Sequence, residues 1–245
     1  LGSVLVLFAK GPNPRLLAFG LAFAGGAMVY VSLSEILNKS IASFANVYGD
    51  KLGFTYGTLS FLAGVLLIAG MDFVVSNPHS PLENKKESFA GFDDRQIKRI
   101  AMMAAIAITA HNFPEGLATF FATLENPHVG LALAFAIAIH NIPEGISIAV
   151  PVYVATNSKS KALLACALSG LAEPVGAIIG YLLLAPYLSD GVFGAVFGVI
   201  SGIMVFLALD ELLPAAKKYA KGHETVYGLV LGMVSLAGSL VLFKW

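Results

Sequence analysis

The sequence predicts an all-α integral membrane protein, an eight-helix transmembrane bundle whose first helix is truncated. Of its 245 residues, 57% are hydrophobic and only 12% are charged, and the mean hydropathy is +0.80. Soluble domains carry about 25% charged residues, so this chain has too few polar side chains to cover a water-soluble body. Apolar windows of about 20 residues, the length that crosses the hydrocarbon core as a helix, recur along the chain.

Composition also excludes several other classes of protein. The single cysteine, Cys166, rules out a disulfide scaffold. Fifteen basic and fifteen acidic residues give no net charge, so no overall basic field favours nucleic acid, and we expect no nucleic-acid partner.

Seven apolar windows are long enough to span a bilayer, namely 15–37, 53–76, 98–123, 128–155, 159–185, 190–213 and 225–244. The opening stretch 1–9 is apolar but short, and it lacks the basic start and cleavage site of a signal peptide. We interpret it as the end of a first helix, which brings the count to eight. One long polar connector, 77–97, is expected to be a flexible cytoplasmic loop within a single transmembrane domain over 1–245.

The basic residues predict the orientation. Three lie on one side, Lys39, Lys51 and Lys244, and twelve on the other: Lys10, Arg15, Lys85, Lys86, Arg95, Lys98, Arg99, Lys159, Lys161, Lys217, Lys218 and Lys221. By the positive-inside rule the richer side faces the cytoplasm, so both termini are expected outside. Every basic residue is thereby assigned to a loop or a helix end.

Acidic residues, in contrast, fall within the apolar windows: Glu35, Asp72, Glu115, Glu144, Glu173, Asp210 and Glu211. A charge at the bilayer centre costs at least about 2.5–3.5 kcal/mol on insertion scales. With no lysine or arginine expected beside these acids, either protonation or a bound cation has to offset that cost. Histidines accompany two of the acids, which favours a metal.

Those two acids belong to the motifs HNFPEG at 111–116 and HNIPEG at 140–145. On a helix, Glu115 lies one turn from both His111 and Asn112. Glu144 has the same relation to His140 and Asn141. The short connector at 124–127 makes the two helices antiparallel neighbours, so two imidazoles, two amide oxygens and two carboxylates could form most of a two-metal site. For a single motif, the alternative is a histidine and a glutamate that simply form a structural hydrogen bond. Two complete copies within the membrane make that alternative much weaker.

Each motif contains a proline, and a proline within a helix frees the carbonyl four residues earlier. Unpaired backbone at membrane depth is tolerated where it lines a polar cavity, so the prolines favour a pathway. Glu173-Pro174 repeats the acid and proline without histidine, and Glu173 could complete the second metal's shell, or be a packed, protonated acid.

The remaining acids lie nearer the helix ends, where they could serve the pathway or simply be hydrated. Glu35 could be an entrance acid, and Asp72, Asp210 and Glu211 could form an exit relay. Met28 offers a thioether, although methionine in an apolar helix is usually core packing.

These motifs, together with GLAEPVG at 170–176 and ALDELLP at 208–214, resemble the ZIP family of divalent metal transporters over essentially the whole chain. The resemblance implies uptake of Zn²⁺, often with Fe²⁺, Mn²⁺, Co²⁺ or Cd²⁺, as the transported substrate. It implies inverted three-helix repeats around a central pair, the fourth and fifth helices, with a binuclear site between them. One metal would be held by His111, Glu115, His140 and Glu144, and the other by Asn112, Glu115, Asn141, Glu144 and Glu173. It also matches Met28 to a ligand of some members, and Asp72, Asp210 and Glu211 to release residues.

The ligand set fits transport. Imidazole, carboxylate and amide oxygen suit Zn²⁺, Fe²⁺ and Mn²⁺ with weak discrimination, and Cys166, expected to lie distant from both motifs, is expected to contribute no thiolate. Discontinuous helices around a midplane site fit alternating access. We therefore expect a multi-pass transporter of the cell membrane, the inner membrane of a bacterium, that takes up divalent cations and holds none as a resident cofactor. The oligomeric state is left open, with a homodimer as one option.

Two rival functions could use the same acidic and histidine side chains. A membrane-embedded di-metal enzyme, a hydrolase or an oxidoreductase, would use similar ligands. The spacing His-x-x-x-Glu, however, matches neither of those enzyme patterns, and no segment supplies a substrate cleft. A proton-coupled carrier of an organic solute would need a basic residue to bind anionic groups, which the motifs lack.

Overall fold

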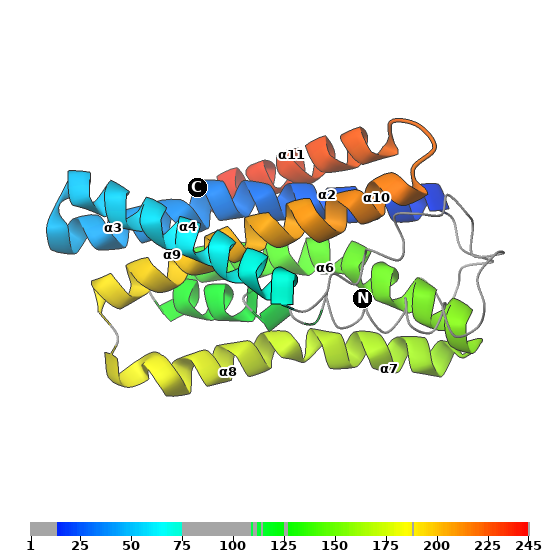
Figure 1. The fold of residues 1–245 in the computed structure, drawn as a ribbon, viewed down its shortest axis with the longest axis horizontal. Coiled ribbons are helices and arrows are strands. Elements are labelled where there is room, and N and C mark those ends of the chain that lie inside the picture. The colour runs from blue at the N-terminus through cyan, green and yellow to red at the C-terminus, as the bar shows by residue number, and fades with distance from the viewer. Residues whose placement is uncertain are drawn as a thin grey trace.

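A computed structural model describes residues 14–74, 109, 112–113, 115–124, 127–187 and 189–244. Within these residues every regular element is a helix, as the sequence predicts (Figure 1). The predicted stretch 1–9, the loop 77–97 and most of the window 98–123 lie outside the described residues.

Two long antiparallel rods form the centre of the bundle (Figure 1). The first consists of α2 (Pro14–Val31), a π-helical turn η1 (Ser32–Ile36) and α3 (Leu37–Tyr48). The second consists of α9 (Asp190–Leu207), the π-helical turn η4 (Ala208–Leu212) and α10 (Leu213–Tyr219). The predicted ends at 37 and 213 are therefore wrong, because the helices continue through a π turn. The first rod ends at Gly49, whose φ of 81° suits a residue without a side chain.

Buried serines join the two rods. The Ser40 hydroxyl donates to the Gly194 carbonyl at 2.6 Å. Further along, the Ser201 hydroxyl donates to the Ser32 carbonyl at 2.7 Å. Hydroxyl-to-carbonyl bonds of this kind help to hold helices together in a bilayer. They matter there because lipid tails are as apolar as the side chains, so the hydrophobic effect does not drive the helices together.

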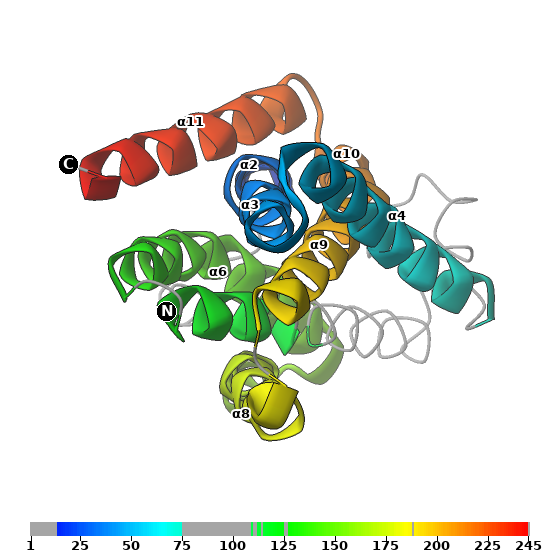
Figure 2. The same cartoon turned by 90° about the vertical axis from the view of Figure 1, so that its left-hand side faces the viewer.

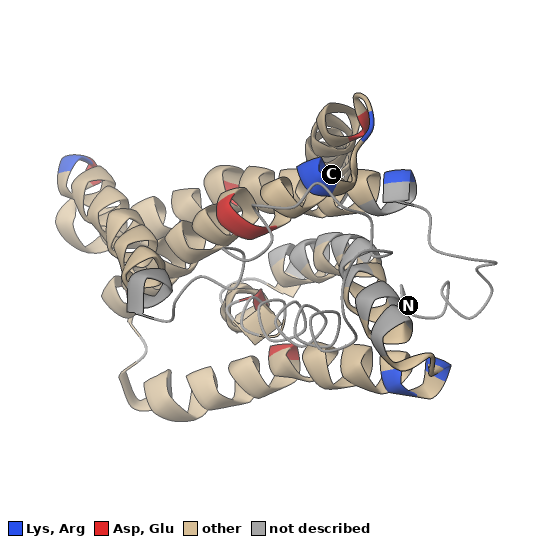
Figure 3. Ribbon diagram, turned by 45° about the vertical axis from the view of Figure 1, so that its right-hand side comes forward, with Lys and Arg blue, Asp and Glu red and all other residues tan. Residues whose placement is uncertain are grey.

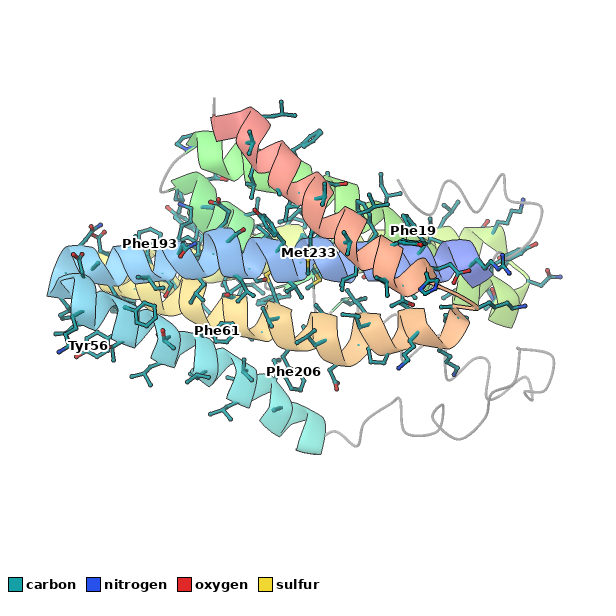
Figure 4. All side chains as sticks on the ribbon, turned by 90° about the horizontal axis from the view of Figure 1, so that it is seen from above. Phe19, Tyr56, Phe61, Phe193, Phe206 and Met233 are labelled. Carbon is teal, nitrogen blue, oxygen red and sulfur yellow. The ribbon has the colours of Figure 1, made fainter. Side chains whose placement is uncertain are left out.

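Each rod also packs closely against one outer helix. A Cβ at Gly26 of α2 would lie 2.1 Å from the Leu229 oxygen of α11 (Glu224–Lys244). A Cβ at Gly202 of α9 would lie 2.0 Å from the Phe61 oxygen of α4 (Asp50–Val74). Phe61 lies where α4 meets α9, and Met233 lies where α11 meets α2 (Figure 4). Such contacts between backbones require glycine, as is common between membrane helices.

The remaining helices lie below the rods, with α7 and α8 end to end at the edge of the bundle (Figures 1 and 2). The long helix α6 (Pro127–Thr156) is followed by α7 (Lys159–Gly170), a turn at Leu171 and α8 (Ala172–Leu184), which ends in the 3₁₀ turn η3 (Ala185–Tyr187). These helices match the predicted windows 128–155 and 159–185.

The described residues contain five helices long and apolar enough to cross a membrane: Ala18–Tyr48, Asp50–Gly70, Lys159–Leu184, Asp190–Tyr219 and Glu224–Leu242. Their outward faces carry exposed leucines, of which Leu242 is 79% exposed, as suits contact with lipid. The core lies between the rods and the 115–124 helix, where Met28, Phe121, Phe197 and Met204 are all fully buried.

Candidate metal site

The two HNxPEG motifs lie on neighbouring helices. Residues 115–124 are helical, as are Asn112 and Phe113, and the second motif lies within α6. A Cβ at Gly130 would lie 2.4 Å from the Thr123 Cα, so the start of α6 packs directly on the end of the first motif's helix. His111 lies outside the described residues, as do the side chains of His140 and Glu144.

The first motif places two polar side chains in the interior. Glu115 is fully buried and Asn112 is 4% exposed. The Asn112 amide nitrogen donates to the Ser169 carbonyl at 3.3 Å, and its contact with the Ser169 hydroxyl is 3.4 Å. Among the described residues, the Asn112 amide oxygen has no hydrogen-bond partner. The side chain is therefore held by its nitrogen, and its oxygen is left as an acceptor in a buried position, where an unpaired polar atom is rare.

The second motif repeats this arrangement. The Asn141 amide nitrogen donates to the Glu173 carboxylate at 2.5 Å. Its amide oxygen, too, has no hydrogen-bond partner in the part of the chain that the structure describes. Two asparagines from different helices are thus held through nitrogen by the α7–α8 segment, and each retains an oxygen of the kind that divalent cations bind.

Glycines bring Glu173 close to the first motif. A Cβ at Gly116 would lie 1.9 Å from the Glu173 carbonyl oxygen, and one at Gly176 would lie 2.4 Å from the Phe113 carbonyl oxygen. The two backbones touch at both points, so any larger side chain would force the helices apart. The structure thereby joins Asn141 to Glu173 directly and packs the backbone at Glu173 against the helix that carries Asn112 and Glu115.

The segment that holds both asparagines is broken at one residue, Leu171, between α7 and α8. The helix stops at Gly170 and restarts at Ala172, two residues before Pro174. Proline has no N–H to donate, so the sequence predicted an interruption near Pro174. At Pro143, in contrast, α6 remains helical from Pro127 to Thr156.

Two neighbours of the site were not anticipated. Ser169, 1% exposed, holds Asn112, although a serine within a helix usually bonds the carbonyl of its own preceding turn. The Cys166 thiol donates to the Gly145 carbonyl at 3.1 Å. The expectation that Cys166 lies far from both motifs is therefore wrong, because α7 packs along α6 and brings it to the end of the second motif.

The other predicted residues lie along the rods. Met28 is buried in the apolar cluster with Phe121 and Met204. This position agrees with the interpretation of Met28 as a core-packing residue. Glu35 lies in η1, and Asp210 and Glu211 lie in η4, all three half-buried. Asp72 belongs to α4, but its side chain lies outside the described residues.

The assignment of every basic residue to a loop or a helix end is wrong for Lys39. Basic residues do gather at helix ends, and acidic residues also occur midway along helices (Figure 3). Lys39, however, is half-buried within α3, four residues after Glu35, and its ammonium lies 5.7 Å from the centre of the Phe197 ring. Attraction between a cation and an aromatic face can accommodate such a charge inside a bundle.

Among the described side chains, no group of three or more His, Cys, Asp or Glu residues converges in a geometry that could hold a metal. The described portion of the predicted site offers two amide oxygens without hydrogen-bond partners there and two carboxylates, the buried Glu115 and the half-buried Glu173.

The five long apolar helices among the described residues, with acidic and amide side chains in the bundle interior, define a multi-pass membrane protein. Residues 75–243 match the family model described as ZIP Zinc transporter, and the chain belongs to that family. It is therefore a transporter rather than an enzyme, which removes the di-metal enzyme as a rival.

Curated relatives cover the chain from end to end. Proteins named Zinc transporter ZupT are 70% identical in Stenotrophomonas maltophilia strain K279a and 71% identical in Xanthomonas axonopodis pv. citri strain 306. A protein of the same name in Neisseria meningitidis strain FAM18 is 66% identical. Each alignment includes 100% of this chain and 90–91% of the relative.

Proposed function

We propose that this chain carries divalent metal cations, chiefly Zn²⁺, across the membrane into the cytoplasm. One observation carries the proposal: Asn112 and Asn141 are each held through nitrogen by the α7–α8 segment, and their amide oxygens lack partners among the described residues. Leaving two buried acceptors unpaired costs about 1–3 kcal/mol each, so their retention in a bundle that also buries Glu115 favours a cation as the missing partner. The names of the relatives favour zinc as that cation.

The site is proposed to be binuclear. His111, Glu115, His140 and Glu144 would hold one ion, and Asn112, Glu115, Asn141, Glu144 and Glu173 would hold the other. The two glutamates of the motifs would bridge the ions, one carboxylate oxygen to each. Met28 would contribute only as a weak, soft ligand, since it lies in the apolar cluster.

These ligand types bind Zn²⁺, Fe²⁺, Mn²⁺, Co²⁺ and Cd²⁺ without strong discrimination, so we propose that the chain accepts several of them. Because histidine and carboxylate must lose their protons to bind metal, uptake should weaken as the pH falls.

Inverted repeats are proposed as the basis of alternating access. Residues 28–37 and 204–213, 176 positions apart, share five of ten residues, and the π turns η1 and η4 occur at the same place in each. The glycine contacts support the same pairing, since Gly26 meets Leu229 and Gly202 meets Phe61. The rods that carry these segments run in opposite directions (Figure 1).

In this proposal the ion enters past Glu35, binds between the HNxPEG helices, and leaves past Asp72, Asp210 and Glu211. Ser32 and Ser201 lie level on the antiparallel rods. Glu35 is three residues beyond Ser32, and Asp210 is nine residues beyond Ser201 in the opposite direction, so the two acids are about 12 residues, or roughly 18 Å, apart along the rods. The starts of α2 and α7 and the end of α10, which carry Arg15, Lys159 and Lys217, lie at one end of the bundle (Figure 1). That end would face the cytoplasm, with both termini outside and the protein in the inner membrane.

Radiolabelled zinc uptake into proteoliposomes tests the proposal. We expect Glu115→Gln, His140→Ala and Glu144→Ala to lose at least tenfold in initial rate. Asp190→Asn, which removes an exposed acid at the start of α9, should retain the rate of the unmodified chain. Equal rates in all four variants would refute the site, and no zinc flux in the unmodified chain would refute the function.

A further inference from the structure

Two π turns lie at corresponding positions in the rods, and both carry proposed pathway acids. In η1 the Leu37 N–H donates to the Ser32 carbonyl, and in η4 the Leu213 N–H donates to the Ala208 carbonyl. Each bond spans five residues instead of the four of an α-helix. Such turns occupy well under 1% of residues in proteins and are frequent at functional sites.

The two turns are held unequally by the opposite rod. The Ser32 carbonyl accepts a second hydrogen bond, at 2.7 Å, from the hydroxyl of Ser201, and both serines are fully buried. The residue that corresponds to Ser201 in the first rod, 176 positions earlier, is Gly25. A Cβ at Gly25 would lie 3.7 Å from the Ala208 oxygen, so this glycine faces the second turn as Ser201 faces the first, but without a hydroxyl.

We propose that Ser201 is a positioning residue for Glu35. Its hydroxyl fixes the register of η1 and thereby the place of Glu35 at the entrance. Gly25 leaves η4 without this restraint, so η4 can exchange between π and α registers. That exchange would rotate Asp210 and Glu211 by about a quarter of a helical turn as the ion is released. The inference rests on the proposed function, because it assigns Glu35 to entry and the acids of η4 to release.

Loss of the Ser201 bond is expected to act on ion capture rather than on turnover. Removing one hydrogen bond of this kind changes an equilibrium by about fivefold. We therefore expect Ser201→Ala to raise the KM for zinc by about fivefold with Vmax changed by less than twofold. Ser40→Ala is the matched control, because its hydroxyl also joins the two rods through a buried carbonyl but away from either π turn.

A double-mutant cycle separates positioning from general packing. If Ser201 acts through Glu35, then adding Ser201→Ala to Glu35→Gln should raise KM no further. A packing role would give additive effects, and that result would overturn the inference.

The corresponding glycine provides a second measurement that does not depend on the folding of Ser201→Ala. A side chain at Gly25 fits, since its Cβ would meet neighbours no closer than 3.5 Å. Gly25→Ser would place a hydroxyl within reach of the Ala208 carbonyl, and Gly25→Ala is the control without one. We expect Gly25→Ser to lower Vmax about fivefold relative to Gly25→Ala, at unchanged KM.

The outcomes are distinguishable. No zinc flux in the unmodified chain would overturn the proposed function and this inference with it. Normal flux, with equal KM in the two serine variants or equal Vmax in the two glycine variants, would overturn the inference alone.

Discussion

Replacing Gly116 with alanine tests whether the contact between the first motif and Glu173 sets the geometry of the site. The added Cβ would lie 1.9 Å from the Glu173 carbonyl oxygen, whereas ordinary van der Waals contact begins at 3.4 Å. The obstacle is backbone on both sides, so no side chain can rotate away. The two helices have to separate by about 1.5 Å, or a turn of one of them has to distort.

The magnitude follows from that overlap. Overpacking of this kind costs about 1–3 kcal/mol. The displaced segment carries Glu173, whose carboxylate holds Asn141, and it lies next to Ser169, which holds Asn112. If about 2 kcal/mol of the strain falls on the metal-bound arrangement, zinc affinity should weaken by about 30-fold.

Zinc uptake into proteoliposomes, with initial rates fitted over a range of zinc concentrations, measures the effect. Gly238→Ala is the matched control, since a Cβ there would meet nothing within 4 Å. A thermal melt of each variant in detergent separates loss of fold from loss of affinity. A Gly116→Ala protein with the KM and Tm of the control would refute the proposed role of this contact.

Three further measurements test the fold and the site. Phe121→Ala should lower the free energy of unfolding by roughly 2 kcal/mol. Moving apolar surface between protein and lipid changes the free energy little, so the cost comes mainly from the cavity that the lost ring leaves. Leu242→Ala, on the exposed surface, should melt at the Tm of the unmodified chain. Gly26→Ala and Gly202→Ala should lower Tm by similar amounts, because their Cβ atoms would overlap equivalent carbonyls at 2.1 and 2.0 Å; a loss in only one would count against the repeat. Zinc at 100 times its Kd should stabilise the protein by about 2.7 kcal/mol, reversibly on chelation, and a Tm indifferent to zinc would contradict a built site.

Local patterns in the sequence were enough to predict the class of fold and the helices that bear the site. Apolar windows of bilayer length and a low content of charge depend only on neighbours along the chain, and the described helices α4, α6 and α11 match their windows closely. The helical spacing within each HNxPEG motif likewise places an acid one turn from an amide. Where a helix continues through a π turn, as at Ser32–Ile36, the same local patterns gave the wrong end.

The contacts that position the site came only from the tertiary structure. Ser169 and Asn112 are 57 residues apart, and Cys166 and Gly145 are 21 apart, so no periodicity links them. The π turn η1, too, is held by the opposite rod, since the second bond to the Ser32 carbonyl comes from Ser201 in a distant segment. Sequence determined that this chain is built from apolar helices of bilayer length, and it predicts metal-binding groups on two of them. Packing between remote helices decided which of those groups meet, because hydrogen bonds and backbone contacts depend on distance in space and not on spacing along the chain.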